Sequence, residues 1–338
     1  MASDKIDSPG AVTKVGPVLA PASPHSARSN AVSGFLDRLF KVAMFLCAAA
    51  ILAVVGLVLY ELIVRSRLTL HAYGWQFFVR DAWDPVSGDF GARAFIYGTL
   101  VSSAVALVLA VPMAVGTAIF VNEISPRFLR RPISFLVELL AAIPSVIYGL
   151  WGIFVLVPVL RNYVEPWLAD AFGWTGLFTG PKYGIGMLAG GVILSIMILP
   201  IIASITREVM LSVPQNQREA VLALGATRWE MIRTGVLRNA RAGILGGVIL
   251  GLGRAMGETM AVTMVIGNTP QIAKSLFAPA TSMAAMIANE FSEATTDMYV
   301  SAIIEVGLAL FIITVIVNII ARALIWMTTR GMPVRADA

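Results

Sequence analysis

Two charged side chains, Arg254 and Glu258, lie four residues apart inside an otherwise apolar stretch of the chain. Each charge at the centre of a membrane helix costs about 2.5–3.5 kcal/mol on insertion scales. A spacing of four places both side chains on one helix face, where they can pair. The guanidinium group also presents a rigid fork of donors that matches the oxygens of phosphate or sulfate. Two interpretations follow: an ion pair that only fixes helix packing, or an anion site in which Glu258 holds Arg254 and balances its charge.

Glycines surround this pair in two stripes. At 3.6 residues per turn, one stripe shares the face of the charged pair and the other lies roughly 100° away. The stripes consist of Gly243, Gly247 and Gly251, and of Gly246, Gly253 and Gly257. Because small residues let membrane helices approach closely, we expect one glycine stripe to pack on a neighbouring helix while the charged stripe faces an interior cavity.

Hydroxyl groups in other apolar stretches could extend the path of a polar substrate. The candidates are Thr99, Ser102, Ser103 and Ser145. The alternative for each of them is a hydrogen bond to its own helix backbone. Ser145 follows Ala142-Ile-Pro, which predicts either a plain proline kink or broken helix geometry lining a cavity. Glu138 and Glu305 lie near the ends of apolar stretches, so we expect both at interfacial positions.

The segment 212–241 is not shaped like a simple connector. Its spacing predicts two short helices joined at Gly225, a residue suited to a left-handed cap. Each helix is expected to begin at a capping box. The boxes are Ser212 with Gln215, which has Pro214 in its first turn, and Thr227 with Glu230. Such a protruding element suits docking into a groove on a partner protein, the alternative being an ordinary amphipathic surface helix.

The composition indicates which elements position these residues. Of the 338 residues, 58% are hydrophobic and 13% are charged, whereas a soluble domain carries about 25% charged residues. A helix needs about 20 residues to cross the hydrocarbon core. The sequence therefore predicts an all-α integral membrane protein. Its six transmembrane helices are expected at 38–63, 95–121, 133–160, 184–206, 243–267 and 301–327.

The first apolar stretch is expected to remain as a membrane span. A signal peptide has an apolar core of about 7–15 residues. The stretch 38–63 is longer than that, and about 38 residues precede it.

The basic residues are distributed unevenly over this topology. With six spans, the N-terminal tail, the second and fourth loops and the C-terminus share one side. Seventeen of the 25 Lys and Arg residues fall on that side, seven on the other, and Arg254 lies within a span. The positive-inside rule then predicts both termini in the cytoplasm, and it explains the basic pI without a nucleic-acid partner. Cys47 can form no intrachain disulfide, and the two histidines give no metal-ligand cluster.

The loop resembles the EAA loop of type I ABC importer permeases. The matching residues are Glu219, Ala220, Gly225, Ala226, Thr227, Arg228, Trp229 and Glu230. In that family the loop forms a coupling helix seated in a cleft of the nucleotide-binding subunit, so the resemblance implies this role here. The family pattern often ends in Leu-Pro, whereas Leu237 is followed by Arg238, which bears on the local exit geometry and not on docking. The sequence has no G-x4-G-K-[ST] phosphate loop, so ATP and Mg are expected on a partner ATPase and no cofactor in this chain.

From about Trp83 to Arg330 the chain is similar to the permease subunits of the phosphate-specific ABC importer, and more to the C-type than to the A-type subunit. Five separated blocks carry the resemblance. They are Trp83-Asp-Pro with Phe90-Gly91-Ala92, Tyr97-Gly-Thr-Leu with Ser102-Ser103, Ala141-Ala-Ile-Pro-Ser-Val-Ile-Tyr-Gly-Leu-Trp-Gly, Leu199-Pro-Ile-Ile, and Gly251-Leu-Gly-Arg-Ala-Met-Gly-Glu-Thr-Met-Ala-Val. The resemblance implies the type I permease fold, an A-type permease partner, two ATPase copies and an extracytoplasmic phosphate-binding protein. It also implies that Arg254 and Glu258 are needed for transport.

We therefore expect a permease, not an enzyme, that passes inorganic phosphate across the bacterial inner membrane by alternating access, in contact with lipid. The expected organisation is a disordered cytoplasmic tail (1–34), the first span with an extracytoplasmic loop (35–94), a core transmembrane domain with its coupling loop (95–327 and 212–241), and a C-terminal tail (328–338). One alternative is a permease for sulfate, molybdate or a phosphonate. The other is an ion-driven secondary transporter or channel, which would leave the capped loop unexplained.

Overall fold

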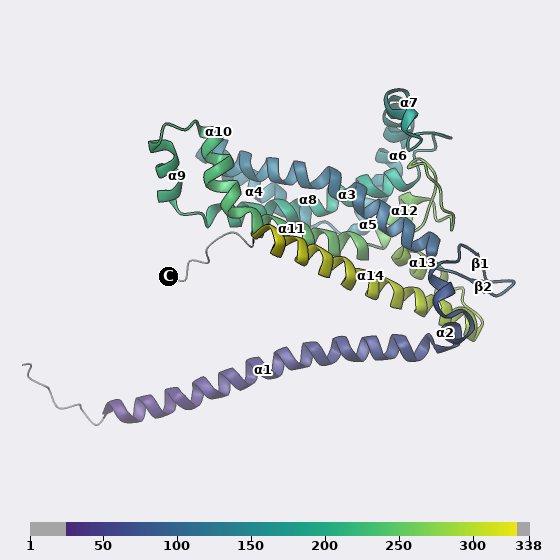
Figure 1. Ribbon diagram of the computed structural model, residues 1–338, viewed down its shortest axis with the longest axis horizontal. Helices are drawn as coiled ribbons and strands as arrows, with labels where there is room; N and C mark the ends of the chain where they lie inside the picture. The colour runs from purple at the N-terminus through teal and green to yellow at the C-terminus, as the bar shows by residue number, and fades with distance from the viewer. Residues whose placement is uncertain (1–24, 330–338) are drawn as a thin grey trace, which may run out of the picture. The chain divides into compact units, whose positions relative to one another are not determined.

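The computed structural model describes residues 25–329, which form helices joined by loops and one small hairpin (Figure 1). The chain divides into two compact units inside the first helix, after Val58. Within the described residues the first unit is a single helix. The elements are α1 (His25–Arg65), α2 (Arg67–Tyr73), β1 (Trp83–Asp84), β2 (Asp89–Phe90), α3 (Arg93–Ile119), α4 (Arg127–Ala142), α5 (Ser145–Trp151), α6 (Val157–Val159), α7 (Glu165–Phe172), α8 (Met187–Leu211), α9 (Gln215–Ala223), α10 (Arg228–Glu230), α11 (Arg238–Gly257), α12 (Met260–Ile266), α13 (Met283–Glu290) and α14 (Asp297–Thr329).

Short stretches of 3-10 and π-helix continue several of these helices. The 3-10 turns are Gly74–Phe78 and Gly173–Thr175, and the π-helical turns are Phe120–Ile124, Gly152–Leu156, Leu160–Val164 and Met231–Leu237. A π-turn inserts an extra residue and often occurs near functional sites. The turn at 231–237 joins the loop helices to α11 without interrupting the helix.

Six helical stretches of the described residues are long and apolar enough to cross a membrane, as the sequence predicts. They are Asp37–Arg65, Arg93–Ile124, Ser145–Thr175, Met187–Leu211, Arg228–Gly257 and Asp297–Met327. The third predicted span, 133–160, is not one helix, because the chain is extended at Ile143 and Pro144 and so separates α4 from α5.

The N-terminal tail differs from the sequence prediction where the structure describes it. Helix α1 begins at His25, so residues 25–34 are helical and not irregular. No proline interrupts the chain between Pro24 and Pro85, which leaves the helix free to extend toward the N-terminus. Residues 1–24 and 330–338, where the rest of the two predicted tails lie, are outside the described residues.

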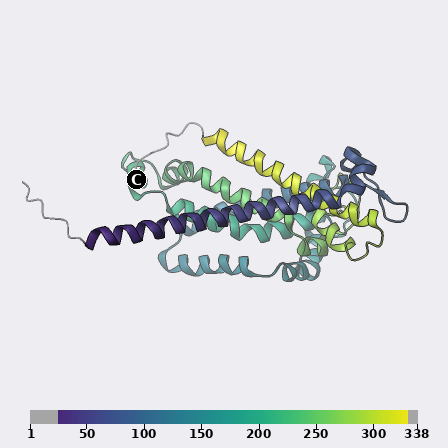
Figure 2. The same cartoon turned by 90° about the horizontal axis from the view of Figure 1, so that it is seen from below.

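Helix α8 lies at the centre of the second unit, with α3, α4 and α11 packed against it (Figures 1 and 2). The contact between α3 and α8 uses small residues on one side and branched residues on the other. Ala106, Ala110 and Ala114 repeat every four residues on α3 and are fully buried in the same core as Ile198 and Ile202 of α8. Small side chains at this spacing allow two helices to approach closely without a polar contact.

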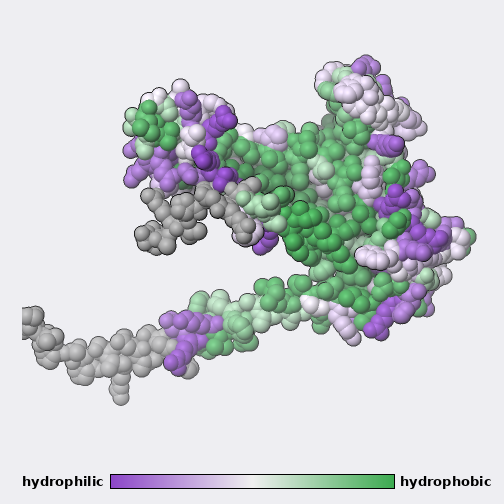
Figure 3. Space-filling view, in the orientation of Figure 1, coloured by the Kyte–Doolittle hydropathy of each residue, from purple (hydrophilic) through white to green (hydrophobic). Residues whose placement is uncertain are grey.

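Apolar and hydrophilic residues occupy different parts of the surface of the second unit. Figure 3 shows apolar residues over the middle of the helices and hydrophilic residues at both ends, around α9 and α10 and around the β1–β2 hairpin. Burial of the apolar middle in a bilayer removes it from water, and the polar ends reach the two aqueous phases. The distribution agrees with a multi-pass membrane protein.

An aromatic cluster closes the end of the second unit that carries the hairpin. Strands β1 and β2 pair antiparallel, and the Trp83 ring contacts the rings of Phe90, Phe95 and Tyr299. In the turn of the hairpin, hydrogen bonds from the Ser87 side chain and from the Val86 backbone lower the pKa of the Asp84 carboxyl. The hairpin is therefore held both by ring packing and by its own acidic turn.

A buried polar cluster joins α2 to α14. Ser66, Thr69, Ser301 and Glu305 are almost completely inaccessible to solvent. The Thr69 backbone N–H donates to the Ser301 hydroxyl at 3.3 Å, and the two hydroxyl oxygens lie 3.0 Å apart. Glu305 is buried within the protein because α2 packs against α14 and covers this position, and its expected interfacial depth stays a prediction.

We predict that a methyl group added at Gly98 destabilises the second unit. A Cβ at Gly98 would lie 2.0 Å from the Thr281 carbonyl oxygen, so α3 and the segment before α13 would have to separate. Gly98→Ala is expected to cost about 1–3 kcal/mol. Gly116→Ala on the same helix is the matched control: no atom lies within 4 Å of its added Cβ, and replacing a helical glycine gains about 0.5–1 kcal/mol. Thermal unfolding in detergent measures both, and equal melting temperatures would contradict this packing.

Candidate functional site

Arg254 lies in the last turn of α11, and Glu258 lies just beyond the end of that helix. Helix α11 ends at Gly257, Glu258 is extended (φ −72°, ψ 128°), and α12 begins at Met260. The predicted continuous helix 243–267 is therefore broken. Because the extended residue leaves the helix face, no ion pair joins Arg254 to Glu258 among the residues whose side chains are described, 37–327. The prediction of a helical pair at a spacing of four is wrong in this structure.

A second break separates α4 from α5, as one of the two interpretations of Ala142-Ile-Pro predicted. Ile143 and Pro144 are both extended (ψ 129° and 140°), which is a break and not a kink. The proline ring disfavours the helical conformation for the residue before it. The Tyr148 hydroxyl donates to the Leu140 carbonyl at 2.8 Å and so adds to the long 3.4 Å hydrogen bond that this carbonyl accepts from the Ile143 backbone N–H.

The two breaks lie next to each other because α5 packs on α12. An added Cβ at Gly149 would lie 3.2 Å from Ala261 Cα, which shows how closely the two short helices approach. Interrupted helices at membrane depth persist only where they are buried in protein or line a water-filled cavity. Arg254 itself is exposed in this chain, which favours the second condition.

The two glycine stripes of α11 have different surroundings. Added Cβ atoms on the first stripe would lie 2.5–3.1 Å from side chains of α8, so this stripe is the packing face; its members are Gly243, Gly247 and Gly251. No atom lies within 4 Å of an added Cβ on the second stripe, which consists of Gly246, Gly253 and Gly257. Arg254 follows Gly251 on the packed stripe, so the prediction that the charged stripe faces a cavity is wrong along α11, and the open stripe lies roughly 100° away from Arg254.

The four predicted hydroxyl residues separate into two groups. Thr99 and Ser102 are buried and donate to their own helix backbone, at 2.8 and 2.7 Å. Thr99 also accepts a hydrogen bond from the Met283 backbone N–H at 2.9 Å, which anchors the start of α13 to α3. The Ser103 hydroxyl is buried and has no hydrogen-bond partner among the described residues. Ser145 alone lies at the α4–α5 break, as the first residue of α5.

The loop between α8 and α11 forms two short helices joined at Gly225, as predicted. Gly225 has φ +84°, a left-handed conformation. The second capping box is confirmed: the Thr227 hydroxyl accepts from the Glu230 backbone N–H at 3.3 Å, and the Glu230 carboxylate accepts from the Thr227 backbone N–H at 2.8 Å.

The first capping box is wrong. Pro214 is the N-cap of α9 in extended conformation, and no side chain caps this helix. The Ser212 hydroxyl donates instead to the Val209 carbonyl at 2.8 Å, because Ser212 still belongs to the end of α8. The departure from the family pattern at Arg238 does not disturb the exit, since the helix runs through Leu237 into α11.

A buried ion pair and an apolar cluster fix this loop to the membrane helices. Arg218 of α9 pairs with Glu123 at 3.0 Å, with only 14% and 6% of the two side chains exposed. Arg218 also donates to the Met210 carbonyl at 2.7 Å. Residues from α3, α8, the π-turn and α11 form one core beneath the loop; they are Ala118, Met210, Val213, Met231, Ile232, Val236 and Ala240. A force on the loop would therefore reach the ends of α3 and α8 directly.

The outer side of the loop presents exposed apolar residues. Leu224 is 89% exposed and Trp229 is 60% exposed. Most residues of the matched motif are also solvent-accessible; they are Glu219, Ala220, Gly225, Thr227, Arg228 and Glu230, with Ala226 half-buried. Exposed tryptophan and arginine side chains, here Trp229 and Arg228, are typical of the residues that dominate docking contacts.

Sequence reasoning missed two of the interactions at these sites. The Arg218–Glu123 pair joins residues 95 positions apart, so no spacing rule can find it. The break after Gly257 has no proline to announce it. Its only signal is the Gly-Glu-Thr run that follows Arg254.

Known proteins resemble this chain in sequence and in fold. Residues 110–325, more than half of the chain, match the family described as binding-protein-dependent transport system inner membrane component. A relative from Mesorhizobium japonicum, named phosphate transport system permease protein PstC, is 48% identical over 88% of this chain and 93% of its own length. A protein of the same name from Haemophilus influenzae is 44% identical over 86% and 93%.

Solved structures confirm the fold. The chain is similar to a bacterial ABC transporter involved in the import of the acidic polysaccharide alginate, with TM-score 0.55, 17% identity and coverage of 88% of this chain and 100% of that one. It is also similar to the inward-facing MetNI methionine ABC transporter, with TM-score 0.51, 19% identity and coverage of 72% and 95%.

We predict that the Arg218–Glu123 pair is needed for the folded loop but is replaceable as a unit. Arg218→Met leaves a buried carboxylate without its partner and is expected to cost about 3–5 kcal/mol. The double variant Arg218→Met/Glu123→Leu removes both charges and should recover most of that loss. Arg65→Met breaks an exposed pair with Glu61 and should cost less than about 1 kcal/mol. The free energy of unfolding of each variant, measured in detergent, tests this double-mutant cycle. A double variant that loses as much stability as the sum of its two single substitutions would contradict the prediction.

Proposed function

The chain belongs to the family of binding-protein-dependent transport system inner membrane components, and from this premise we propose that it is the C-type permease subunit of an ATP-driven importer of inorganic phosphate. The observation that carries the proposal is an exposed Arg254 beside two adjoining helix breaks, in a chain whose relatives are named as phosphate transport permeases over more than four-fifths of its length.

Phosphate would meet Arg254 at the breaks. A guanidinium offers several N–H donors in one plane, and phosphate presents oxygens at a matching separation. The open glycine stripe places no side chain over the adjacent surface of α11, so a hydrated anion could approach the backbone there. Glu258 lies just beyond the end of α11 and forms no ion pair with Arg254, and we assign it the role of a gate that can move to pair with Arg254 when phosphate is absent. Ser145 would supply a further hydroxyl.

The energy would come from a separate ATPase dimer. The sequence has no phosphate-binding loop of its own, so ATP and Mg would bind to the partner. The loop of α9 and α10 would dock on that partner through Leu224, Trp229 and the charged residues around them. Closure of the ATPase dimer on ATP would move the loop. The buried pair and the core beneath the loop would then move α3 and α8 and open the path outward.

The complete transporter would contain this chain and an A-type permease as a heterodimer, the ATPase dimer, and an extracytoplasmic phosphate-binding protein. Both termini would lie in the cytoplasm of the bacterial inner membrane, because the loop side of the molecule carries most of the basic residues. This chain would be a transport subunit without hydrolytic chemistry of its own.

Arg254→Gln is predicted to lower phosphate uptake by about 100-fold in vesicles that contain the complete complex. The reason is that the loss of a charge-assisted contact costs about 3 kcal/mol. Arg254→Lys keeps the charge and loses the fork, so it should retain intermediate uptake. Labelled phosphate measures the initial rate, and sulfate or molybdate as competitor tests the related oxyanions. Uptake by Arg254→Gln at the unmodified rate would refute the anion site. Uptake of labelled sulfate or molybdate by the unmodified complex, without uptake of labelled phosphate, would assign another substrate.

Gly225→Val is predicted to uncouple ATP hydrolysis from transport. An added Cβ at this position meets no atom within 4 Å, so we attribute the expected effect to the left-handed backbone, which β-branched residues strongly disfavour. Gly225→Asn is the control, since asparagine tolerates this conformation. Co-purification of the ATPase subunit and ATP hydrolysis stimulated by the loaded binding protein are the measurements. The same coupling in both variants would show that the turn at Gly225 does not shape the docking surface.

A further inference from the structure

A basic cavity lies at the end of the helices that carries the α9–α10 loop, apart from the breaks at Arg254. It has a volume of about 290 Å³ and lies between the ends of α3, α4 and α8. Arg130 and Arg131 line it from α4, and Arg207 lines it from α8. Three arginines face it against one glutamate, Glu138, so its charge is positive. Nothing in the transport path described above uses these residues.

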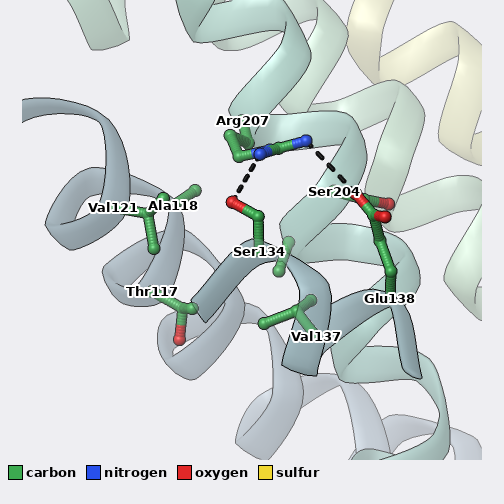
Figure 4. Close-up of a pocket in the computed structure, with 9 residues that line it drawn as sticks. Thr117, Ala118, Val121, Ser134, Val137, Glu138, Ser204 and Arg207 are labelled. Atoms are coloured by element: carbon green, nitrogen blue, oxygen red, sulfur yellow. Dashed lines mark hydrogen bonds and ion pairs between the residues drawn. The ribbon is translucent and has the colours of Figure 1, made fainter. Parts of the chain in front are cut away.

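Arg207 is fixed in place by its neighbours. One terminal nitrogen of its guanidinium donates to the Ser134 hydroxyl, and the other lies 3.4 Å from the Glu138 carboxylate (Figure 4). The Asn122 side-chain amide donates to the Arg207 carbonyl at 2.9 Å. Glu138 therefore compensates Arg207, and the other two arginines supply the excess charge.

Arg130 and Arg131 keep most of their donors free. Arg130 Nε donates to the Ser125 carbonyl at 3.2 Å, which orients the guanidinium and leaves its two terminal nitrogens available. Among the side chains that the structure describes, neither Arg130 nor Arg131 has an ion-pair partner. Two guanidinium groups that line one cavity and keep free donors match the oxygens of a phosphate group, in mono- or diester form.

The wall of the cavity is apolar as well as basic. Phe135 of α4 and Leu211 of α8 line it together with the arginines. Phe135 is 63% exposed, and the same helix exposes further apolar side chains toward its surroundings; they are Phe128, Leu136 and Leu139. A ligand that fills this cavity would combine an anionic head with an apolar chain, and basic pockets between membrane helices on the cytoplasmic side bind anionic lipid head groups.

We propose that the ends of α3, α4 and α8 form a binding site for the phosphate group of an anionic phospholipid. Arg130 and Arg131 bind the phosphate oxygens, Arg207 closes the site from α8, and Phe135 packs along the acyl chain. The bound lipid ties α4 to α8, which matters because α4 has no fully buried residue of its own. The placement of this site in the cytoplasmic leaflet rests on the proposed orientation of the chain in the membrane. The match between the arginines and a phosphate group does not depend on that orientation.

The test uses the full-length chain in detergent and native mass spectrometry with phosphatidylglycerol, with phosphatidylcholine as the zwitterionic reference. Arg130→Gln/Arg131→Gln should raise the apparent Kd for phosphatidylglycerol by roughly 10- to 30-fold, since each basic residue near an anionic surface contributes about a factor of five. Phosphatidylcholine binding should not change. Arg127→Gln is the matched control, because Arg127 begins the same helix without lining the cavity, and its Kd should stay within about twofold of the unmodified chain.

Inorganic phosphate is titrated alone in a second arm, because it shares the oxyanion chemistry. Phosphatidylglycerol binding that requires Arg130 and Arg131 supports the proposal. Inorganic phosphate binding that requires them, without phosphatidylglycerol binding, overturns the lipid assignment. Equal phosphatidylglycerol binding by the double Gln variant and the unmodified chain overturns the site.

A further pair of measurements separates loss of binding from loss of folding. Arg130→Lys/Arg131→Lys keeps both charges, so it should fold and still bind phosphatidylglycerol more weakly than the unmodified chain. Its melting temperature in the same detergent reports its folding, and full affinity in this variant would overturn the role of the guanidinium forks. Neither the binding measurement nor the melting measurement involves transport. The lipid-binding result therefore stands even if the chain does not transport phosphate.

Discussion

The close packing of α3 on α8 is the contact on which the rest of the second unit depends. Alanines at every fourth position of α3 let the two helices approach, and the glycines of α11 pack on α8 in the same way. Helix α8 thus becomes a shared core element that no polar contact has to stabilise. At one end the α3–α8 pair carries the loop through Arg218 and Glu123. Toward the other, α3 anchors α13 through Thr99.

The two helix breaks contrast with the continuous, closely packed helices α3 and α8. The bilayer supplies no water for unpaired backbone groups, so a chain segment that is extended at Ile143 and Pro144, and again at Glu258, must satisfy them within the protein or from a cavity. Tyr148 donates a hydrogen bond to the Leu140 carbonyl in the last turn of α4. At the second break, the exposed Arg254 and the open Gly257 lie in the last turn of α11. The closely packed α3–α8 pair would let a movement of the α9–α10 loop pass to both helices without deforming their shared core.

Much of the fold could be predicted from the sequence, because membrane helices carry strong and local signals. Apolar stretches give the number of spans, and Gly225 with Thr227 and Glu230 gives the shape of the loop. The same local rules fail where tertiary contacts decide the outcome. Glu258 leaves its helix although its spacing fits a pair, and Ser212 stays in α8 although it fits a capping box. No sequence pattern announces Arg218 with Glu123, since their contact exists only after α9 has folded back.

Water access along the open glycine stripe is the most direct test that the breaks beside Arg254 line the substrate path. On a Cys47→Ala background, which removes the natural cysteine, single cysteines replace Gly257 on the open stripe and Ala255 on the buried face of the same helix. A charged, membrane-impermeant thiol reagent is then applied to the assembled complex in vesicles. The account predicts that Gly257→Cys reacts, that phosphate slows the reaction, and that Ala255→Cys does not react. An unreactive Gly257→Cys, or a reaction rate that phosphate leaves unchanged, would contradict it.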